Sequence, residues 1–140
     1  MKLIEKRMNL FEVNDNYYLA HCISSDFEMG AGIAVEFNKK FNMRSRLRTR
    51  FGYKTYFPKT VLIDRVFNLI TKGRYYGKPT YQTIEKTIIE MKNICADNNI
   101  KYLAMPKIGC GLDRLSWGKV REIIKEQFKD IDIEILVCSI

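Results

Sequence analysis

Two short glycine-containing segments have the residue types that bind phosphate. Gly30-Ala31-Gly32 and Gly109-Cys110-Gly111 each open a helical pattern, and the second follows an apolar, strand-like run at Tyr102–Met105. Glycine adopts backbone conformations that larger residues rarely reach, and successive amides beside a helix start form a nest for an anion. A single G-x-G is commonly only a turn, whereas two can supply amides from both sides of a diphosphate. We therefore expect an anion site between the two segments.

Two residues close to these segments could do chemistry. Lys72 ends an apolar strand-like run, where partial desolvation favours the neutral amine that acts as a nucleophile. Asp113 follows the second glycine segment and would lie at the bound ligand. Spacing alone leaves both open, because strand-end lysines are often solvated and an aspartate before a helix is often a cap or turn residue. The pattern by itself therefore fixes no reaction.

The sequence offers little for a metal site. Its four cysteines, Cys22, Cys95, Cys110 and Cys138, form no C-x-x-C pair, and His21 is the only histidine. Zinc sites commonly need four such ligands at close spacings, so we expect neither a metal nor another cofactor. We expect His21 to be a hydrogen-bonded core residue. The cysteines are predicted to be buried free thiols in a reducing cytoplasm, except Cys110 between its two glycines.

The elements that must position Lys72 and Asp113 alternate along the chain. Strand patterns cover residues 3–7, 17–23, 60–63, 65–71, 102–105 and 133–138, and helical patterns follow Gly32, Thr80 and Ser116. This order indicates a layered α/β fold with parallel strands at least in the last strand-helix-strand unit. With 140 residues, 46% of them apolar, and no linker or repeat, residues 1–140 are predicted to form one domain.

The net charge of +8 is concentrated in one segment. From Lys39 to Lys54 there are seven basic residues and no acid, and bases and acids nearly balance elsewhere. Arg44, Arg46, Arg48 and Arg50 alternate, which on a helix distributes them around the axis. The segment is thus either a solvated helix or a contact surface for nucleic acid or another polyanion.

No targeting or membrane segment is expected. Residues 1–7 contain no apolar stretch of signal-peptide length, and nowhere do about 18 apolar residues run together. We expect a cytoplasmic monomer with no membrane partner.

Five ordered motifs resemble those of the macrodomain family, and more narrowly its branch that includes terminal ADP-ribose protein glycohydrolase. They are Leu19-Ala20-His21-Cys22-Ile23-Ser24, Met29-Gly30-Ala31-Gly32-Ile33-Ala34, Leu69-Ile70-Thr71-Lys72, Lys78-Pro79-Thr80-Tyr81 and Met105-Pro106-Lys107-Ile108-Gly109-Cys110-Gly111-Leu112-Asp113-Arg114. The resemblance extends nearly from end to end. It implies a three-layer α/β/α sandwich with a mixed central sheet that binds ADP-ribose.

The resemblance also implies roles for individual residues. Lys72 would attack the anomeric carbon of the distal ribose, and Asp113 would handle the proton. The implied ADP-ribose site comprises the two glycine loops and their neighbours: Asn9, Leu10, Ser24, Gly30, Ala31, Gly32, Ile33, Thr71, Pro106, Ile108, Gly109, Cys110, Gly111 and Leu112. Macrodomains commonly carry a Gly-Asp pair after the first strand, whose aspartate accepts from the adenine amine. Met8 and Asn9 stand there, and an amide acceptor weakens that hydrogen bond by about 1 kcal/mol.

The implied activity is an ADP-ribosyl hydrolase that releases ADP-ribose from glutamate side chains of ADP-ribosylated proteins. Two alternatives remain. One is removal of ADP-ribose from a nucleic-acid base, which the Lys39 to Lys54 segment favours. The other is a module that binds ADP-ribose without turning it over.

Overall fold

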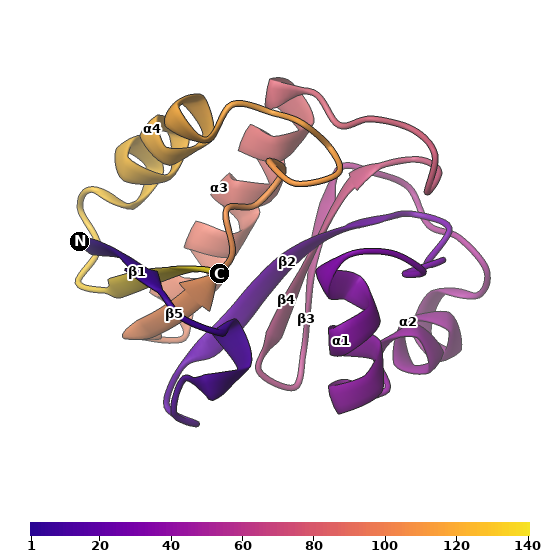
Figure 1. Ribbon diagram of the computed structural model, residues 1–140, viewed down its shortest axis with the longest axis horizontal. Helices are drawn as coiled ribbons and strands as arrows, with labels where there is room; N and C mark the ends of the chain where they lie inside the picture. The colour runs from indigo at the N-terminus through magenta and orange to yellow at the C-terminus, as the bar shows by residue number, and fades with distance from the viewer.

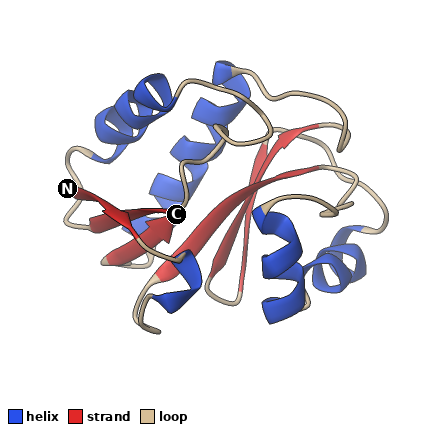
Figure 2. Ribbon diagram, viewed as in Figure 1, coloured by secondary structure: helices blue, strands red, loops and turns tan.

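The computed structural model, which describes residues 1–140, is a three-layer α/β/α sandwich, as the resemblance implied (Figures 1 and 2). The elements in chain order are β1 (Lys2–Arg7), the 3-10 turn η1 (Leu10–Glu12), β2 (Tyr18–Ser24), α1 (Ile33–Phe41), α2 (Met43–Phe51), β3 (Lys59–Ile63), β4 (Val66–Lys72), α3 (Tyr81–Asp97), β5 (Tyr102–Met105), α4 (Trp117–Phe128) and β6 (Glu134–Ser139).

The six strands form one mixed sheet in the order β1-β6-β5-β2-β4-β3. All neighbouring pairs are parallel except β3 and β4, which are antiparallel. The carboxyl ends of β5, β2 and β4 therefore lie side by side at one edge. In open α/β sheets this edge is where ligands bind.

Helices cover both faces of the sheet, α3 and α4 on one and α1 and α2 on the other (Figure 1). Each face has its own buried core. Along β2, Ala20 packs against the α3 and α4 side, whereas Leu19 and Ile23 pack against the α1 and α2 side. Because both faces of the central strands are buried, these strands appear in the sequence as runs of consecutive apolar residues.

At two of the three predicted helix starts, the residue before the helix has the capping contact or the backbone conformation that we expect. Thr80 caps α3 reciprocally with Thr83: the Thr80 hydroxyl accepts from the Thr83 amide at 3.1 Å, and the Thr83 hydroxyl accepts from the Thr80 amide at 3.0 Å. Gly32 precedes α1 with a φ of 62°, a left-handed value that favours glycine. Ser116 precedes α4, but its side chain makes no capping hydrogen bond.

The expectation that Gly109-Cys110-Gly111 opens a helix is wrong. Helix α4 begins only at Trp117, and the intervening residues form a turn. The Leu115 amide donates back to the Gly109 carbonyl at 2.8 Å, and Arg114 has a left-handed φ of 61°. The chain therefore closes a loop here before the helix can start.

His21 is a core residue, as predicted. It is fully buried, its Nε2 lies 2.6 Å from Asn68 Oδ1, and its ring stacks on Phe37 with centroids 3.9 Å apart. All four cysteines are free, with Cys95 and Cys138 buried. Cys22 is partly exposed, contrary to expectation, because it faces a cleft at the end of β2.

No helix combines the length and apolar character that crossing a membrane requires.

Candidate active site

A cleft of about 720 Å³ opens at the carboxyl ends of the central strands. Its volume lies within the range of about 300–1,000 Å³ that is usual for small-molecule sites. It is lined by Cys22, Ile23, Ser24, residues 28–34, Lys72, Tyr75, Tyr76, Lys78, residues 106–109 and residues 111–113.

Lys72 and Asp113 meet in this cleft. Lys72 is the last residue of β4, Asp113 lies in the loop after β5, and Lys72 Nζ is 2.7 Å from Asp113 Oδ1. Their side chains are only 14% and 13% exposed. Lys72 is therefore not a solvated strand-end lysine, and Asp113 is not a helix cap. A charge-assisted hydrogen bond of this length offers a direct path for a proton between amine and carboxylate.

The two glycine loops approach each other beside this pair. A Cβ at Gly32 would lie 3.4 Å from Leu112 Cδ1, so the first loop packs directly against the second. Gly109 has a left-handed φ of 75°, and a Cβ there would press on Ile84 and Leu115. A Cβ at Gly111 would meet nothing within 4 Å. Gly109 thus holds the loop shape, and Gly111 borders open space in the cleft.

Asp26, which the sequence did not single out, fastens the loop after β2 to the loop after β4. Its carboxylate accepts from the Ser24 hydroxyl at 2.5 Å and from the backbone amides of Tyr75 at 2.9 Å and Glu28 at 3.3 Å. Burial alone would raise the pKa of Asp26, but these hydrogen bonds outweigh it and hold the pKa below its usual value. The polar run Ser24-Ser25-Asp26 after a buried strand is the sequence signal that could have revealed it.

Ser25 fixes the position of Lys72 through the backbone. The Ser25 amide donates to the Lys72 carbonyl at 2.8 Å, and its hydroxyl donates to the Gly73 carbonyl at 2.7 Å. The end of β4 is therefore held by β2 on the side next to the cleft.

Most residues of the expected site line the cleft together with Lys72 and Asp113. These are Ser24, Gly30, Ala31, Gly32, Ile33, Pro106, Ile108, Gly109, Gly111 and Leu112.

The other four do not line it. Leu10 is buried in the core, and Thr71 is fully buried within β4. Asn9 caps η1, with its Oδ1 accepting from the Phe11 amide at 2.9 Å, so its amide oxygen is already engaged. The Cys110 thiol is directed to the Ile108 carbonyl at 3.2 Å.

Several cleft residues were not expected from the sequence. Tyr75 and Tyr76, each 62% exposed, form an edge-to-face pair at the rim, and Lys78 Nζ donates to the Leu112 carbonyl at 2.8 Å. Burial raises the pKa of the Cys22 thiol, and the nearby Asp113 carboxylate adds to the shift, so the thiol stays protonated. The adjacent tyrosines between Gly73 and Gly77 are the signal that could have marked this rim.

Comparisons with known proteins match this chain to one family and one fold. The Macro domain family model matches residues 58–124. The human and bovine proteins named ADP-ribose glycohydrolase OARD1 are each 41% identical over 136 residues, covering 94% of this chain and 88% of their own.

Solved macrodomains share the fold at low sequence identity. The macrodomain of Thermus aquaticus DarG aligns with a TM-score of 0.85 and 20% identity, covering 99% of this chain and 98% of its own. For that of Mycobacterium tuberculosis DarG the TM-score is 0.87 at 18% identity, with 99% and 97% covered. A structure described as Thermosipho africanus DarTG in complex with ADP-ribose gives 0.80 at 17% identity, covering 99% of this chain and 42% of that chain. Given 41% identity to the human relative across nearly its whole length, this chain belongs to the macrodomain family.

Proposed function

We propose that this macrodomain binds ADP-ribose in the cleft and removes it from glutamate side chains of modified proteins. The observation that carries the proposal is the 2.7 Å contact between Lys72 Nζ and Asp113 Oδ1 inside the cleft. The names of the human and bovine relatives, ADP-ribose glycohydrolase, support hydrolysis, and the description of the Thermosipho structure supports ADP-ribose as the ligand.

The diphosphate would lie between the loops 30–33 and 109–112. Both loops line the cleft, and the glycines in them allow backbone amides to approach an anion without an intervening Cβ. With the diphosphate held there, the distal ribose would extend toward Lys72 at the end of β4.

The reaction needs a neutral amine and a proton donor, and one proton transfer supplies both. When the proton of Lys72 moves to Asp113, Nζ gains a free electron pair and the carboxyl group becomes an acid. The amine attacks the anomeric carbon, the bond from that carbon to the glutamate oxygen breaks, and the glutamate carboxylate leaves.

The covalent intermediate then resolves within the same pair. Asp113 donates its proton to the ribose ring oxygen, and the ring carbon–oxygen bond breaks. The nitrogen of Lys72 gives one of its two protons to the Asp113 carboxylate, and its electron pair forms the carbon–nitrogen double bond of a protonated Schiff base. Water adds to this imine, the carbon–nitrogen bond breaks, and free ADP-ribose leaves with Lys72 restored as an amine.

A turnover assay on glutamate-, serine- and thymine-linked ADP-ribose tests the proposal. Lys72→Ala should still bind ADP-ribose but lose turnover of the glutamate-linked substrate. Asp113→Ala should also lose turnover, because Asp113 takes the proton that frees the Lys72 amine and protonates the ribose ring oxygen. Borohydride added to the wild-type protein during turnover should trap the Schiff base as a Lys72 adduct that mass spectrometry detects, and Asp113→Ala should form less of it. Lys101→Ala is the matched control, because it breaks an exposed lysine–aspartate pair, to Asp132 at 3.2 Å, outside the cleft. Wild-type turnover by Lys72→Ala would exclude the covalent route.

A second candidate is removal of ADP-ribose from a nucleic-acid base, which the exposed pair of Tyr75 and Tyr76 at the cleft mouth favours. An aromatic rim can stack on a departing base but offers little to a carboxylate. Turnover of the thymine-linked substrate alone would select this candidate. Product release from any substrate would exclude a module that only binds.

A further inference from the structure

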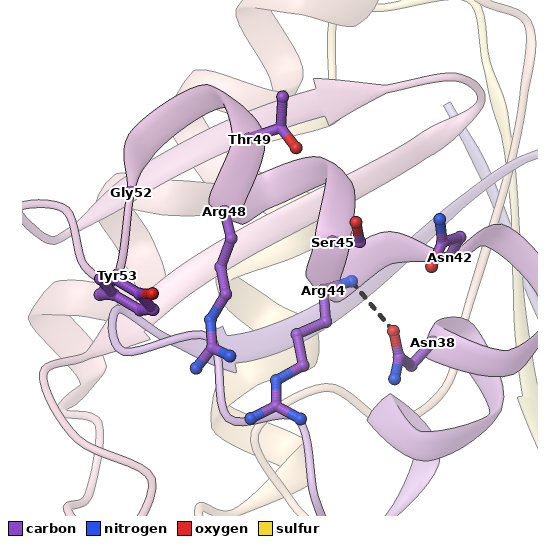
Figure 3. A pocket seen from close by; sticks show the side chains of 8 residues that line it. All are labelled: Asn38, Asn42, Arg44, Ser45, Arg48, Thr49, Gly52 and Tyr53. Carbon is purple, nitrogen blue, oxygen red and sulfur yellow. Dashed lines mark hydrogen bonds between the residues drawn. The ribbon is translucent and has the colours of Figure 1, made fainter.

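A second hollow, of about 620 Å³, lies on α2 and the residues around it (Figure 3). Met43 and Leu47 are fully buried and anchor α2 to the sheet. Arg44 and Arg48, four residues apart, extend from the helix in the same direction, and Tyr53 lies beside Arg48 (Figure 3). The basic segment is therefore organised around a hollow and does not present an evenly solvated helix.

The hollow keeps an excess of positive charge. A single acid, Glu28, faces both arginines, at 3.4 Å from Arg44 and 3.6 Å from Arg48. The Nε atoms of both arginines are buried and have no hydrogen-bond partner. Nearby, Arg50 and Lys54 form none of the ion pairs of the structure. One carboxylate cannot neutralise this group of cations.

Exposed aromatic rings adjoin these cations. Tyr53 is 82% exposed and has the Arg48 guanidinium 5.5 Å from its ring centroid. Tyr56 is 70% exposed and has Lys59 Nζ at 4.2 Å. Because these two rings are largely exposed, they are available to stack on the rings of a ligand.

The aromatic segment continues to the cleft. The Thr55 amide donates to the Ser25 carbonyl at 3.2 Å, and Ser25 in turn bonds the backbone of Lys72. The Phe57 ring abuts Gly73, where a Cβ would lie 3.0 Å from Phe57 Cε1. The exposed rings therefore run from the α2 hollow to the residue that follows Lys72.

We propose that Arg44, Arg48, Tyr53 and Tyr56 form a binding surface for single-stranded nucleic acid that leads to the cleft. Alternating cations and exposed rings suit a single strand, whose phosphates meet the cations while its unpaired bases stack on the rings. A duplex hides its base faces, and an acidic protein segment would use only the cations. The surface lies outside the ADP-ribose cleft, so its binding depends on no step of the proposed hydrolysis.

Fluorescence anisotropy with dye-labelled oligothymidylate and oligouridylate of about a dozen nucleotides tests the surface. Tyr53→Ala and Tyr56→Ala should each weaken binding about tenfold, because each removes one stacked base. Tyr53→Phe and Tyr56→Phe should bind as the wild type does, since the ring remains. Tyr102→Ala, an exposed tyrosine at the start of β5, is the control and should have no effect. The two oligonucleotides show whether DNA or RNA is preferred.

Charge variants test the phosphate contacts separately. Arg44→Gln and Arg48→Gln should each reduce the slope of log K against log salt by about 0.7, the value for one phosphate contact on a single strand. Lys86→Gln, on α3 at the opposite face of the sheet, should leave the slope unchanged. Glu28→Gln should tighten binding about fivefold, because it removes the one acid that faces Arg44 and Arg48.

Three results would overturn the proposal: no binding of either oligonucleotide at low salt, wild-type affinity in both tyrosine-to-alanine variants, or equal affinity for a duplex or for polyglutamate. Urea unfolding shows in parallel that each variant is folded. Since no turnover is measured, failure here is distinct from failure of the proposed hydrolase activity.

Discussion

The two glycines of the second loop should respond to alanine in opposite ways. At Gly109 the added methyl group meets a left-handed backbone with a φ of 75° and contacts of 3.1 Å to Ile84 Cδ1 and 3.2 Å to Leu115 Cδ1. At Gly111 the backbone is outside that region and the methyl group meets open space. Gly109→Ala should therefore damage the fold, and Gly111→Ala should damage only the site.

The magnitudes follow from these two environments. A left-handed backbone costs a residue with a Cβ about 1–2 kcal/mol, and the tight contacts at Gly109 add to that cost. Gly109→Ala should thus lower the free energy of unfolding by about 2 kcal/mol or more. Gly111→Ala should change it by no more than about 0.5 kcal/mol, as for a surface substitution without strain.

Urea unfolding and calorimetric titration with ADP-ribose separate the two effects. Gly111→Ala should keep wild-type stability and lose ADP-ribose affinity, because its methyl group stands where amides would approach the diphosphate. Gly111→Glu should abolish binding, since it adds bulk and a like charge. Unchanged ADP-ribose affinity in Gly111→Glu would refute the placement of the diphosphate, and equal stability of the two alanine variants would refute the strain assigned to Gly109.

Three further predictions concern stability. Burial lowers the pKa of His21 to about 4 from an ordinary 6.5, against the opposing contact to Asn68, so the unfolded chain binds the proton first as the pH falls. The free energy of unfolding should then decrease by about 3 kcal/mol between pH 6.5 and pH 4, and urea unfolding of His21→Gln should lack this dependence. Thr80→Ala should lower the free energy of unfolding by about 1 kcal/mol by removing the cap of α3, whereas Thr80→Ser should restore it. Asp26→Ala should lower it by about 2 kcal/mol, because the Tyr75 amide loses a charged acceptor, and a loss below 0.5 kcal/mol would contradict that role.

The local elements were predictable because their signals are local. Apolar runs gave each strand to within about two residues, and helical spacing together with the Thr80 cap gave α3. The basic segment was less predictable. One of the two alternatives for it is a solvated helix, but Asn42 lies within the segment, adopts a left-handed φ of 51° and separates α1 from α2. Asparagine tolerates that conformation, yet its presence in a sequence does not require it.

The pairing of Lys72 with Asp113 could not be predicted from spacing, because the order of the strands in the sheet brings the two residues together. Lys72 and Asp113 are 41 positions apart in the sequence. Lys72 ends β4 and Asp113 lies in the loop after β5, and these two strands are not neighbours in the sheet. The two residues come together only because β2 lies between those strands and all three end at the same edge. No local pattern encodes that order, so only resemblance to a family could distinguish the two residues from solvated ones.

A β-bulge explains how Lys72 reaches the cleft. In the pairing of β2 with β4, Ile23 lies opposite Ile70, but Ser24 lies opposite Lys72, so Thr71 is an extra residue without a partner. Side chains alternate between faces along a strand, and a bulge re-aims the residue that follows it. The Thr71 hydroxyl is left buried without a hydrogen bond, a cost that a strand with regular pairing would avoid. We infer that the bulge turns the Lys72 amine toward Asp113 and that this placement accounts for the cost. With regular pairing, Lys72 would be shifted by one position relative to Ser24 and the cleft.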